Sequence, residues 1–441
     1  MALDWLLDSM RARTDAPALA WEGGTATFGD LLARVARFES VLDSCEVHAG
    51  DVVAFVGDYS PGTCALLLAL IQRGAIAVPL TDAVAARRST MLSLAQASHC
   101  FTFDSNDDWR HEAVQAEVTH ELLLGLAASG RPGLIIFSSG STGPMKAALH
   151  DFDRILEKFK LPRPRRVTLT FLLLDHIGGI NTLLGALACG GMIVAPTSRD
   201  AVEVCRLIER HRVDLLPASP TFLGLLLLSE AYRHFDLSSL KLITYGTEPM
   251  PASTLRRLHD AFPQATLQQT YGLSEVGILR SKSKSSDSLF VKVGGEGFET
   301  KIVDNLLWIR SQSAMLGYLN APSPFDAEGW MNTGDAVEVD GEFIRILGRT
   351  TEIINVGGSK VSPADVESVL LELPNVQDAV VFAAPHAVTG QVVAARLRLA
   401  EPEDPDALRT RVRAACRLRL ARHQIPVHVE VADGPLFGAR F

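Results

Sequence analysis

The chain has 441 residues, 47% of them hydrophobic and 21% charged, and a formal net charge of −9. This length allows two or three domains of ordinary globular composition. The negative charge argues against nucleic-acid binding, and no apolar run reaches the roughly 20 residues of a membrane-spanning helix, so we expect neither partner.

Residues 28–80 alternate between helix and strand patterns. Apolar residues at helical spacing define one buried helix face, at Leu31, Leu32, Val35, Phe38 and Leu42. A buried strand follows Gly50 and Asp51, the apolar stretch Pro61–Arg73 predicts a helix ended by Gly74, and residues 75–80 predict another strand. This rhythm predicts a parallel sheet with crossover helices, and we expect a polar surface loop at residues 104–110.

Residues 134–149 combine a short buried strand with a polar loop. The strand is followed by a run of hydroxyls and glycines, and Lys146 closes the loop; the run is Ser138, Ser139, Gly140, Ser141, Thr142 and Gly143. Glycines let successive backbone N–H groups turn towards one anion, and the hydroxyls and lysine add donors and positive charge, which suits a polyphosphate. The Walker spacing GxxxxGK[ST] is absent, and the stretch alone is equally consistent with a plain surface loop.

Three later apolar runs also end in polar residues. The run 167–174 ends in Asp175, His176, Ile177, Gly178 and Gly179 and leads into a helix. Ligands bind at such strand ends in open α/β sheets, although a polar turn with a hydrogen-bonded histidine is the alternative. Two more strands end in residues 246–248 and 272–275, each with a glutamate. A carboxylate beside a polyphosphate usually holds Mg²⁺, because it would otherwise repel the phosphates.

From residue 289 onward, short alternating strands predict an antiparallel sheet, and a smaller unit with two helices follows. Residues 362–365 have the spacing of a capping box with proline at the first helical position. The second helix, at residues 406–422, carries six arginines, which we interpret as a solvated face or, alternatively, as a docking surface for a phosphorylated partner. They are Arg409, Arg411, Arg413, Arg417, Arg419 and Arg422.

Four segments in this order resemble the adenylate-forming (AMP-binding) enzymes, a superfamily that includes acyl-CoA synthetases, aryl-acid ligases and stand-alone adenylation domains. The segments are SSGSTGPMK, YGLSE, WMNTGD at residues 330–335 and GRTTEIINVGGSKVSPADVE at residues 348–367. The resemblance covers the chain from about residue 28. It implies a multi-domain α/β fold. Residues 1–349 would form a large domain with parallel α/β sheets and a small β-barrel-like part. Residues 350–441 would form a small mobile α+β domain that swings about a hinge at Thr350 and Thr351.

The resemblance also implies the chemistry. Such enzymes join a carboxylic acid to ATP, release pyrophosphate and leave an acyl-adenylate, which many of them transfer to a thiol. Because carboxylate and phosphate are both negative, positioning and charge neutralisation must lower the barrier. The catalytic residues implied are His176, Thr270, Glu275 and Lys146, with Glu275 holding Mg²⁺. Residues implied to bind ATP are the loop from Ser138 to Lys146, then Gly246, Thr247, Glu248, Tyr271, Gly272, Asp335 and Arg349. Within this set, Tyr271 would stack near the adenine and Asp335 would accept hydrogen bonds from the ribose hydroxyls.

His176 resembles the gating residue at the acid pocket of this family. The pocket residues implied are mostly small or apolar, and they are Asp175, His176, Gly179, Ile180, Leu183, Tyr245, Gly246 and Ile278. They predict a modest, largely apolar acid, either aryl or medium-chain. Alternatively, Asp175 faces the pocket and binds a substrate amine.

The chain departs from the family pattern in three places. The family loop usually reads TGxPK, whereas the proline here stands one position earlier, at Pro144. The hinge position is Thr351, where aspartate or lysine is commoner. The C-terminal lysine of the family is missing from residues 435–441, where Arg440 is the nearby cation and an imperfect substitute. Either the natural chain continues past Phe441 or this form adenylates poorly.

Three functions therefore compete. The first is a ligase that uses ATP and Mg²⁺ and then CoA or phosphopantetheine, with an acyl carrier protein as an alternative partner to CoA. The second hands the adenylate to an amine and forms an amide. The third is a non-catalytic homologue that keeps the nucleotide pocket. In the first case, residues 357–360 should face the active site in the thiol-transfer orientation of the small domain. Six scattered cysteines without a CxxC pair, and an N-terminus without the pattern of a signal peptide, lead us to expect a cytoplasmic protein with reduced thiols.

Overall fold

The N-terminal part of the protein is built on two sheets with parallel centres. The structure is a computed structural model that describes residues 3–138, 145–432 and 436. The first sheet has the strand order β20-β8-β7-β4-β3-β5-β6, and its four central strands are parallel. Its strands are β3 (Val52–Val56), β4 (Ile76–Leu80), β5 (His99–Phe103), β6 (Trp109–Ala113), β7 (Gly133–Ser138), β8 (Lys146–Asp151) and β20 (Gly317–Tyr318).

The second sheet has the order β13-β12-β11-β9-β10-β1-β2 and is parallel except for the edge pair β1–β2. Its strands are β1 (Pro17–Trp21), β2 (Gly24–Thr27), β9 (Val167–Leu169), β10 (Met192–Val194), β11 (Leu215–Ala218), β12 (Leu242–Tyr245) and β13 (Thr266–Gln269). Parallel strands need crossover connections, and helices supply them here.

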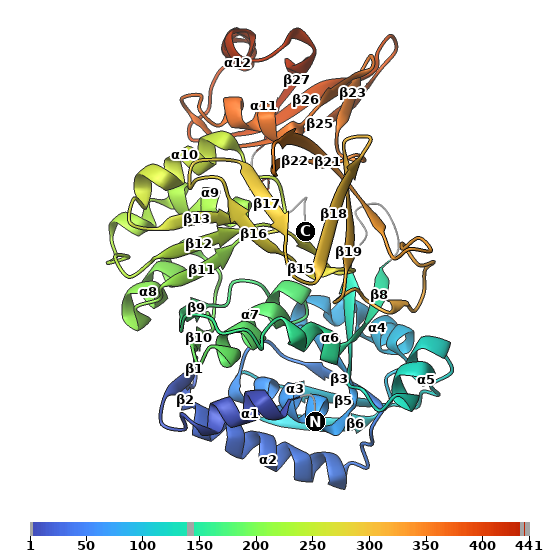
Figure 1. Ribbon diagram of the computed structural model, residues 1–441. Helices are drawn as coiled ribbons and strands as arrows, with labels where there is room; N and C mark the ends of the chain where they lie inside the picture. Colours follow the sequence, from blue (N-terminus) through green and yellow to red (C-terminus); the bar gives the residue numbers. More distant parts are fainter. Residues whose placement is uncertain (1–2, 139–144, 433–435, 437–441) are drawn as a thin grey trace.

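The helices of this part cover both sheets (Figure 1). They are α1 (Asp4–Arg11), α2 (Phe28–Ser44), α3 (Pro61–Arg73), α4 (Arg88–Ala95), α5 (Glu121–Ala128), α6 (Phe152–Glu157), α7 (Ile177–Ala188), α8 (Ala201–His211), α9 (Pro220–Ser229) and α10 (Ala252–Ala261), with short 3₁₀ turns η1 (Asp82–Arg87) and η2 (Ala231–Arg233). One hydrophobic cluster joins α3 and α7 to strands of both sheets, so these two helices pack between the sheets. The prediction for α3 is confirmed, and Gly74 follows it with φ +76°.

A six-stranded antiparallel sheet follows, in the order β16-β17-β22-β21-β19-β18, which confirms the predicted change of architecture. Its strands are β16 (Arg280–Ser283), β17 (Phe290–Gly294), β18 (Phe298–Val303), β19 (Leu306–Ser311), β21 (Met331–Asp340) and β22 (Phe343–Arg349). The short hairpin β14 (Gly272–Leu273) and β15 (Gly277–Ile278) lies before it in the chain. Together with the two large sheets, the six-stranded antiparallel sheet completes a multi-domain α/β fold.

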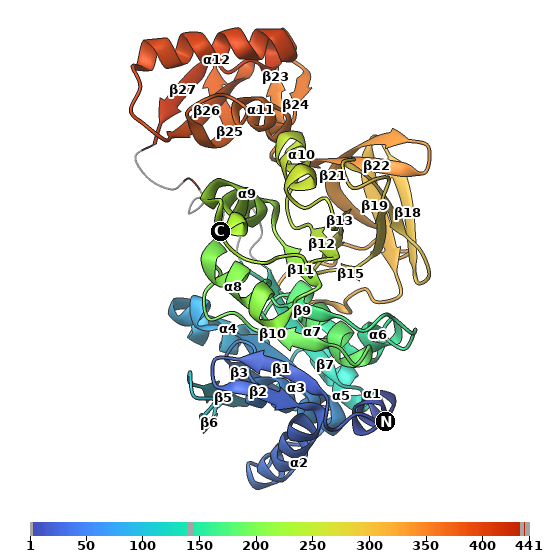
Figure 2. The same ribbon diagram turned by 90° about the vertical axis from the view of Figure 1, so that its left-hand side faces the viewer.

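The C-terminal unit has its own sheet and its own hydrophobic core. It consists of β23 (Ile354–Val356), β24 (Ser359–Val361), α11 (Pro363–Leu370), β25 (Val376–His386), β26 (Gly390–Leu399), α12 (Pro405–Arg419), η3 (Arg422–Gln424) and β27 (His428–Val431). Figure 2 shows this unit standing on α10, with α12 on its outer side. At the contact, the Ser253 N–H donates to Ser368 Oγ at 2.9 Å, and Arg256 pairs with Glu372.

One local prediction holds in part and one is wrong. Residues 104–108 form the expected loop, which is exposed except at Asp107, and Trp109 begins a strand. Asp107 is buried, and its carboxylate accepts from the Ser60 hydroxyl and the Gly62 N–H. The capping box at residues 362–365 does not form, because Ser362 donates to the Leu347 carbonyl instead. In both cases a tertiary partner outcompetes the local pattern.

All six cysteines are free thiols, as predicted. Within the described ranges, none of the helices has both the length and the apolar character that a bilayer crossing requires.

Candidate active site

The ends of the glycine- and hydroxyl-rich loop are fixed by strand pairing. Ser138 and Lys146 lie opposite each other in the antiparallel pair β7–β8. Asn320 holds the second end, because its amide donates to the Met145 carbonyl at 2.7 Å and accepts from the Ala147 N–H at 2.9 Å. The other loop residues, Ser139, Gly140, Ser141, Thr142 and Gly143, lie outside the described residues, and their phosphate contacts stay predictions.

Lys146 and Glu275 both contact one tyrosine, Tyr318. The ammonium of Lys146 is 4.9 Å from the centroid of the Tyr318 ring, and the Tyr318 hydroxyl donates to Glu275 Oε1. Burial and the neighbouring Glu275 raise the pKa of Tyr318, which keeps the phenol protonated as a donor. The Met315 N–H also donates to the Glu275 carbonyl at 2.8 Å, so both the backbone and the side chain of this glutamate are positioned.

A second group joins Tyr271, Asp335 and Arg349. Asp335 is only 6% exposed, and it faces Arg349 across the strand pair β21–β22. Arg349 Nε lies 3.3 Å from Asp335 Oδ1, and the Tyr271 hydroxyl donates to Oδ2. Burial raises the pKa of Asp335, whereas the bond from Tyr271 and the charge of Arg349 lower it. Both oxygens of this buried carboxylate therefore face donors, and the hydroxyl groups of a ligand could take the place of these donors.

The two groups belong to one site. The charge of Glu275 contributes to raising the pKa of Asp335, and the charge of Arg349 lowers that of Tyr318, so the groups interact electrostatically. Among the described residues, no cluster of three or more metal-binding side chains is present. Glu275 as a single protein ligand fits Mg²⁺, which commonly takes one or two carboxylates and completes its shell with phosphate oxygens and water.

The strand ends after β12 and β13 approach each other closely. A Cβ on Gly246 would lie 2.7 Å from the Thr270 carbonyl oxygen, and the Thr270 hydroxyl donates to the Tyr245 carbonyl at 3.1 Å. Thr247 has φ +74°, a conformation that few non-glycine residues adopt. The Glu248 side chain accepts from the Thr221 N–H at 2.7 Å at the start of α9, so its carboxylate is occupied there. A side chain at Gly272 would collide with Ile278, which explains the glycine.

At the predicted acid pocket, Asp175 and His176 precede α7. Asp175 Oδ2 accepts from the Thr81 hydroxyl at 2.8 Å. Its buried Oδ1 has no hydrogen-bond partner among the described residues and lies 3.7 Å from His176 Nε2. The His176 side chain is 58% exposed. The Tyr59 hydroxyl donates to the Gly179 carbonyl at 2.9 Å and lies 3.1 Å from that of Leu172, which anchors this segment.

The remaining predicted pocket residues are mostly buried. Ile180 and Leu183 are fully buried in the core, and a Cβ on Gly179 would meet the Leu173 carbonyl at 1.9 Å. Tyr245 is 1% exposed, and Ile278 is half-buried. The contacts between residues predicted to bind ATP are therefore more extensive than those between residues predicted to line the pocket for the carboxylic acid.

Sequence reasoning missed two residues. Tyr318 stands 43 positions from Glu275, and no local pattern links the two. Lys158 donates to the Ile278 carbonyl at 3.1 Å, and burial lowers the pKa of this lysine to about 7. A small cavity of about 10 Å³ next to it is lined by Ile155, Lys158, Ile177, Asn181, Gly277 and Ser313. No sequence signal distinguishes Lys158 from an ordinary surface lysine at a helix end.

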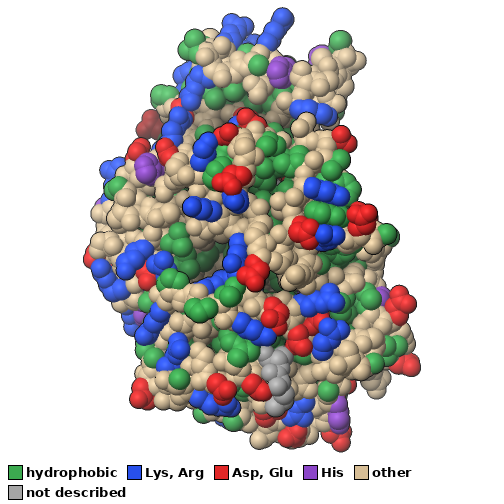
Figure 3. All heavy atoms as spheres, viewed as in Figure 1, with side chains coloured by type: hydrophobic (Ala, Val, Ile, Leu, Met, Phe, Trp, Pro, Cys, Tyr) green, Lys and Arg blue, Asp and Glu red, His purple; other side chains and the backbone are tan. Residues whose placement is uncertain are grey.

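Charged side chains of both signs are interspersed over the face that carries α7 and β16, as Figure 3 shows, so no basic field covers that face. Residues 6–319 match the family described as AMP-binding enzyme, and residues 365–436 match the AMP-binding enzyme C-terminal domain. The chain belongs to the AMP-binding enzyme family.

Relatives and solved structures support this assignment. A feruloyl-CoA synthase from an Amycolatopsis species is 27% identical, over 97% of this chain and 94% of its own length. A 4-coumarate–CoA ligase-like protein from Arabidopsis thaliana is 28% identical, over 59% of this chain and 52% of its own length. The chain thus spans about half the length of that relative.

Two solved structures share the fold over nearly the whole chain. An anthranilate–CoA ligase in complex with anthranoyl-AMP aligns with a TM-score of 0.82 and 20% identity, covering 98% of this chain and 93% of its own. An amide bond synthetase from Marinactinospora thermotolerans aligns with a TM-score of 0.77 and 22% identity, covering 98% and 96%.

Proposed function

We propose that this protein uses ATP to activate a small, largely apolar carboxylic acid as an acyl-adenylate and transfers the acyl group to a thiol. The observation that carries the proposal is the buried Asp335, held between Tyr271 and Arg349 and electrostatically coupled to Glu275. A buried carboxylate that accepts two hydrogen bonds suits the two hydroxyls of a ribose.

The residues have distinct roles in this proposal. A carboxylate oxygen of the acid attacks the α-phosphorus, the bond to the β-phosphate breaks, and pyrophosphate leaves with the electron pair. Lys146 and the loop after Ser138 would neutralise the leaving pyrophosphate, and Glu275 would hold a Mg²⁺ ion, which would supply further positive charge there. In the second step the thiol attacks the acyl carbon and AMP leaves. Thr270 would contact the α-phosphate region, and His176, whose side chain is exposed just before α7, would admit the acid or the thiol.

The acid is proposed to be aryl or medium-chain. Apolar side chains around α7 and Ile278 favour an apolar body. The alternative is that Asp175 binds a substrate amine, since its Oδ2 accepts from Thr81 while its Oδ1 has no hydrogen-bond partner among the described residues. The names of the relatives agree with an aryl acid, since they include feruloyl-CoA and 4-coumarate–CoA ligases.

Two units are proposed to share the reaction. Residues 1–349 would bind ATP and acid, and residues 350–441 would rotate about Thr350 and Thr351 between the two half-reactions. The separate hydrophobic core of the C-terminal unit supports this division. The contact between Ser253 and Ser368 is small and polar, which suits an interface that opens and closes.

Carboxylate-dependent exchange of labelled pyrophosphate into ATP tests the proposal. The panel would contain benzoate, anthranilate, 4-coumarate, ferulate and octanoate. We expect exchange with at least one aryl or medium-chain acid; no exchange with any acid would contradict the proposal. Product masses with CoA, a holo carrier protein or simple amines then identify the acceptor, and an amide as sole product would favour the amine-acylating alternative.

A further inference from the structure

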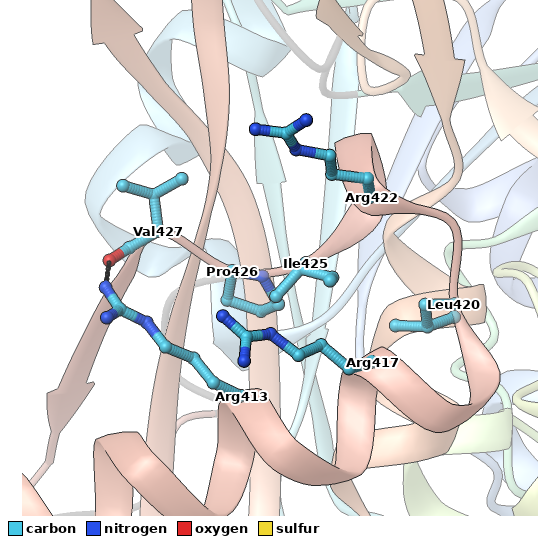
Figure 4. Close-up of a pocket in the computed structure, with 7 residues that line it drawn as sticks. All are labelled: Arg413, Arg417, Leu420, Arg422, Ile425, Pro426 and Val427. Atoms are coloured by element: carbon cyan, nitrogen blue, oxygen red, sulfur yellow. Dashed lines mark hydrogen bonds between the residues drawn. The ribbon is translucent and has the colours of Figure 1, made fainter.

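The C-terminal half of α12 and the segment after it enclose a hollow of about 490 Å³. Its apolar surface comes from Leu420, Ile425, Pro426 and Val427, and three arginines line it: Arg413, Arg417 and Arg422. Figure 4 shows Arg417 and Arg422 on either side of Ile425 and Pro426. We call this feature the arginine hollow.

Among the described residues, no carboxylate neutralises the arginines of the hollow. Other arginines on α12 have carboxylate partners, since Arg409 pairs with Asp406 at 2.8 Å and Arg411 with Glu403 at 2.6 Å. Arg419 likewise pairs with Glu372. By contrast, no carboxylate in the described part of the chain forms an ion pair with any of the three arginines of the hollow. Arg413 donates to the Val427 carbonyl at 3.3 Å. Three guanidinium groups without a carboxylate partner in the described part of the chain favour an anionic ligand.

Apolar side chains are exposed beside these charges. Val427, which lines the hollow together with the three arginines, is 44% exposed. Exposed apolar side chains bordered by arginines are typical of protein interfaces. A free phosphate would satisfy the arginines but would leave this apolar surface in water. A partner with acidic and apolar side chains on one face would cover both.

The position and the charge of the arginine hollow narrow the partner further. Figures 1 and 2 both place α12 at the outer side of the C-terminal unit, away from the two large sheets. The whole chain carries a net charge of −9, so an acidic protein is repelled by most of its surface and attracted at a locally basic patch. Such a patch therefore fixes where and how an acidic partner docks.

We propose that the arginine hollow docks an acidic amphipathic helix of an acyl carrier protein, which delivers the thiol that accepts the acyl group. The inference rests on the proposed function, because that function supplies the thiol acceptor. Carboxylates of the helix would pair with Arg413, Arg417 and Arg422, and an apolar side chain would lie over Ile425 and Pro426, in the manner of a helix bound in a groove.

The test compares two thiol acceptors in the full-length protein. The variant R413Q/R417Q/R422Q removes the three charges, and R409Q is the matched control, because Arg409 lies on the same helix but pairs with Asp406. The probes are a holo acyl carrier protein of net negative charge and free CoA. We expect the triple variant to lose at least tenfold in kcat/KM for the carrier through a raised KM, and less than twofold for CoA. R409Q should change neither, and the wild-type rate with the carrier should fall as salt rises.

Each other outcome overturns the inference. Equal losses with carrier and CoA would place the arginines at a site for the CoA nucleotide or in the shared machinery. No loss with the carrier, or no transfer to the carrier by the wild-type protein, would remove the docking role. Pyrophosphate exchange is measured in parallel, and its absence with every acid would contradict the proposed function instead. In that case, direct binding of the same carrier to wild-type protein and triple variant decides the docking proposal, and equal affinities overturn it.

Discussion

Arg349, the last residue of β22, faces Asp335 in the middle of the paired strand β21, and Arg349 Nε lies 3.3 Å from Asp335 Oδ1. Arg349 is also the residue directly before the proposed hinge. The buried carboxylate is thereby linked to the point where the C-terminal unit would turn, so the proposed ribose site and the start of the proposed hinge share one ion pair.

Asp335→Ala should abolish most nucleotide binding. Removal of an acceptor for two hydroxyl groups should lower the affinity for ATP and the exchange rate by about 10²-fold, because each charged hydrogen bond contributes roughly 1.5–3 kcal/mol. Asp340→Ala is the matched control, since Asp340 ends the same strand but pairs with Lys284 at the surface. Calorimetric titration with ATP checks the result, and equal affinities of the two variants would exclude a ribose role for Asp335.

Tyr271→Phe should move the acidic limb of the pH profile. The Tyr271 hydroxyl lowers the pKa of Asp335, whereas burial raises it, so loss of the hydroxyl raises that pKa further. Because Asp335 accepts from the ribose only when it is ionised, the rise of kcat/KM for ATP with pH should shift to higher pH in this variant. An unchanged acidic limb would show that another group controls it.

Glu275→Gln should weaken Mg²⁺ binding. An amide oxygen is a poorer ligand for this hard cation, so about tenfold more Mg²⁺ should be needed for half-maximal exchange. Tyr318→Phe leaves the carboxylate in place and removes only the hydroxyl bonded to it, so it should have a smaller effect. A titration of exchange against Mg²⁺ separates the two, and identical curves for Glu275→Gln and wild type would remove Glu275 from the metal site.

Lys158→Met should stabilise the protein at low pH. Folding lowers the pKa of Lys158 from its usual 10.5 to about 7, so the unfolded chain binds more protons than the folded one between these values. Stability therefore rises with pH through this window, and the cost of burying the ammonium is largest below pH 7. The variant should melt a few degrees higher than wild type at pH 6 and gain less at pH 9.5.

Lys160→Met serves as the control for that prediction, because Lys160 is exposed and pairs with Glu157. Calorimetric scans at both pH values give the comparison. A gain for Lys158→Met that does not depend on pH would show that packing, and not the buried charge, limits stability at this position.

An engineered disulfide tests the proposed rotation. The Ser253 and Ser368 hydroxyl oxygens lie 3.1 Å apart across the contact between α10 and α11, so S253C/S368C should cross-link on oxidation. The oxidised protein should keep one half-reaction and lose the other by at least tenfold, and reduction should restore it. The wild-type protein under the same oxidant controls for its six native thiols. Full retention of both half-reactions in the cross-linked protein would argue against rotation.

The helices and strands could be predicted well from the sequence, because the signals for them are local. The apolar stretch of α3, its proline start and Gly74 after its end all lie within one short segment. Asp335 and Glu275 could be proposed as site residues because each stands in a family motif. Their partners were not, since the bonds from Tyr318 to Glu275 and from Tyr271 to Asp335 join residues far apart in the chain. Asp107 was missed for the same reason, as a polar residue made buried by the distant Ser60 and Gly62.

The most direct test of the central claim follows the oxygen atoms of the acid. The protein would be incubated with ATP, Mg²⁺, CoA and a free carboxylic acid that supports pyrophosphate exchange. This acid would carry ¹⁸O in both carboxylate positions. Attack of the carboxylate on the α-phosphorus, followed by thiol attack on the acyl carbon, leaves one ¹⁸O in AMP, and mass spectrometry of the nucleotide detects it. The account predicts AMP with one ¹⁸O and unlabelled pyrophosphate. Unlabelled AMP, or ADP together with ¹⁸O-labelled phosphate, would contradict it.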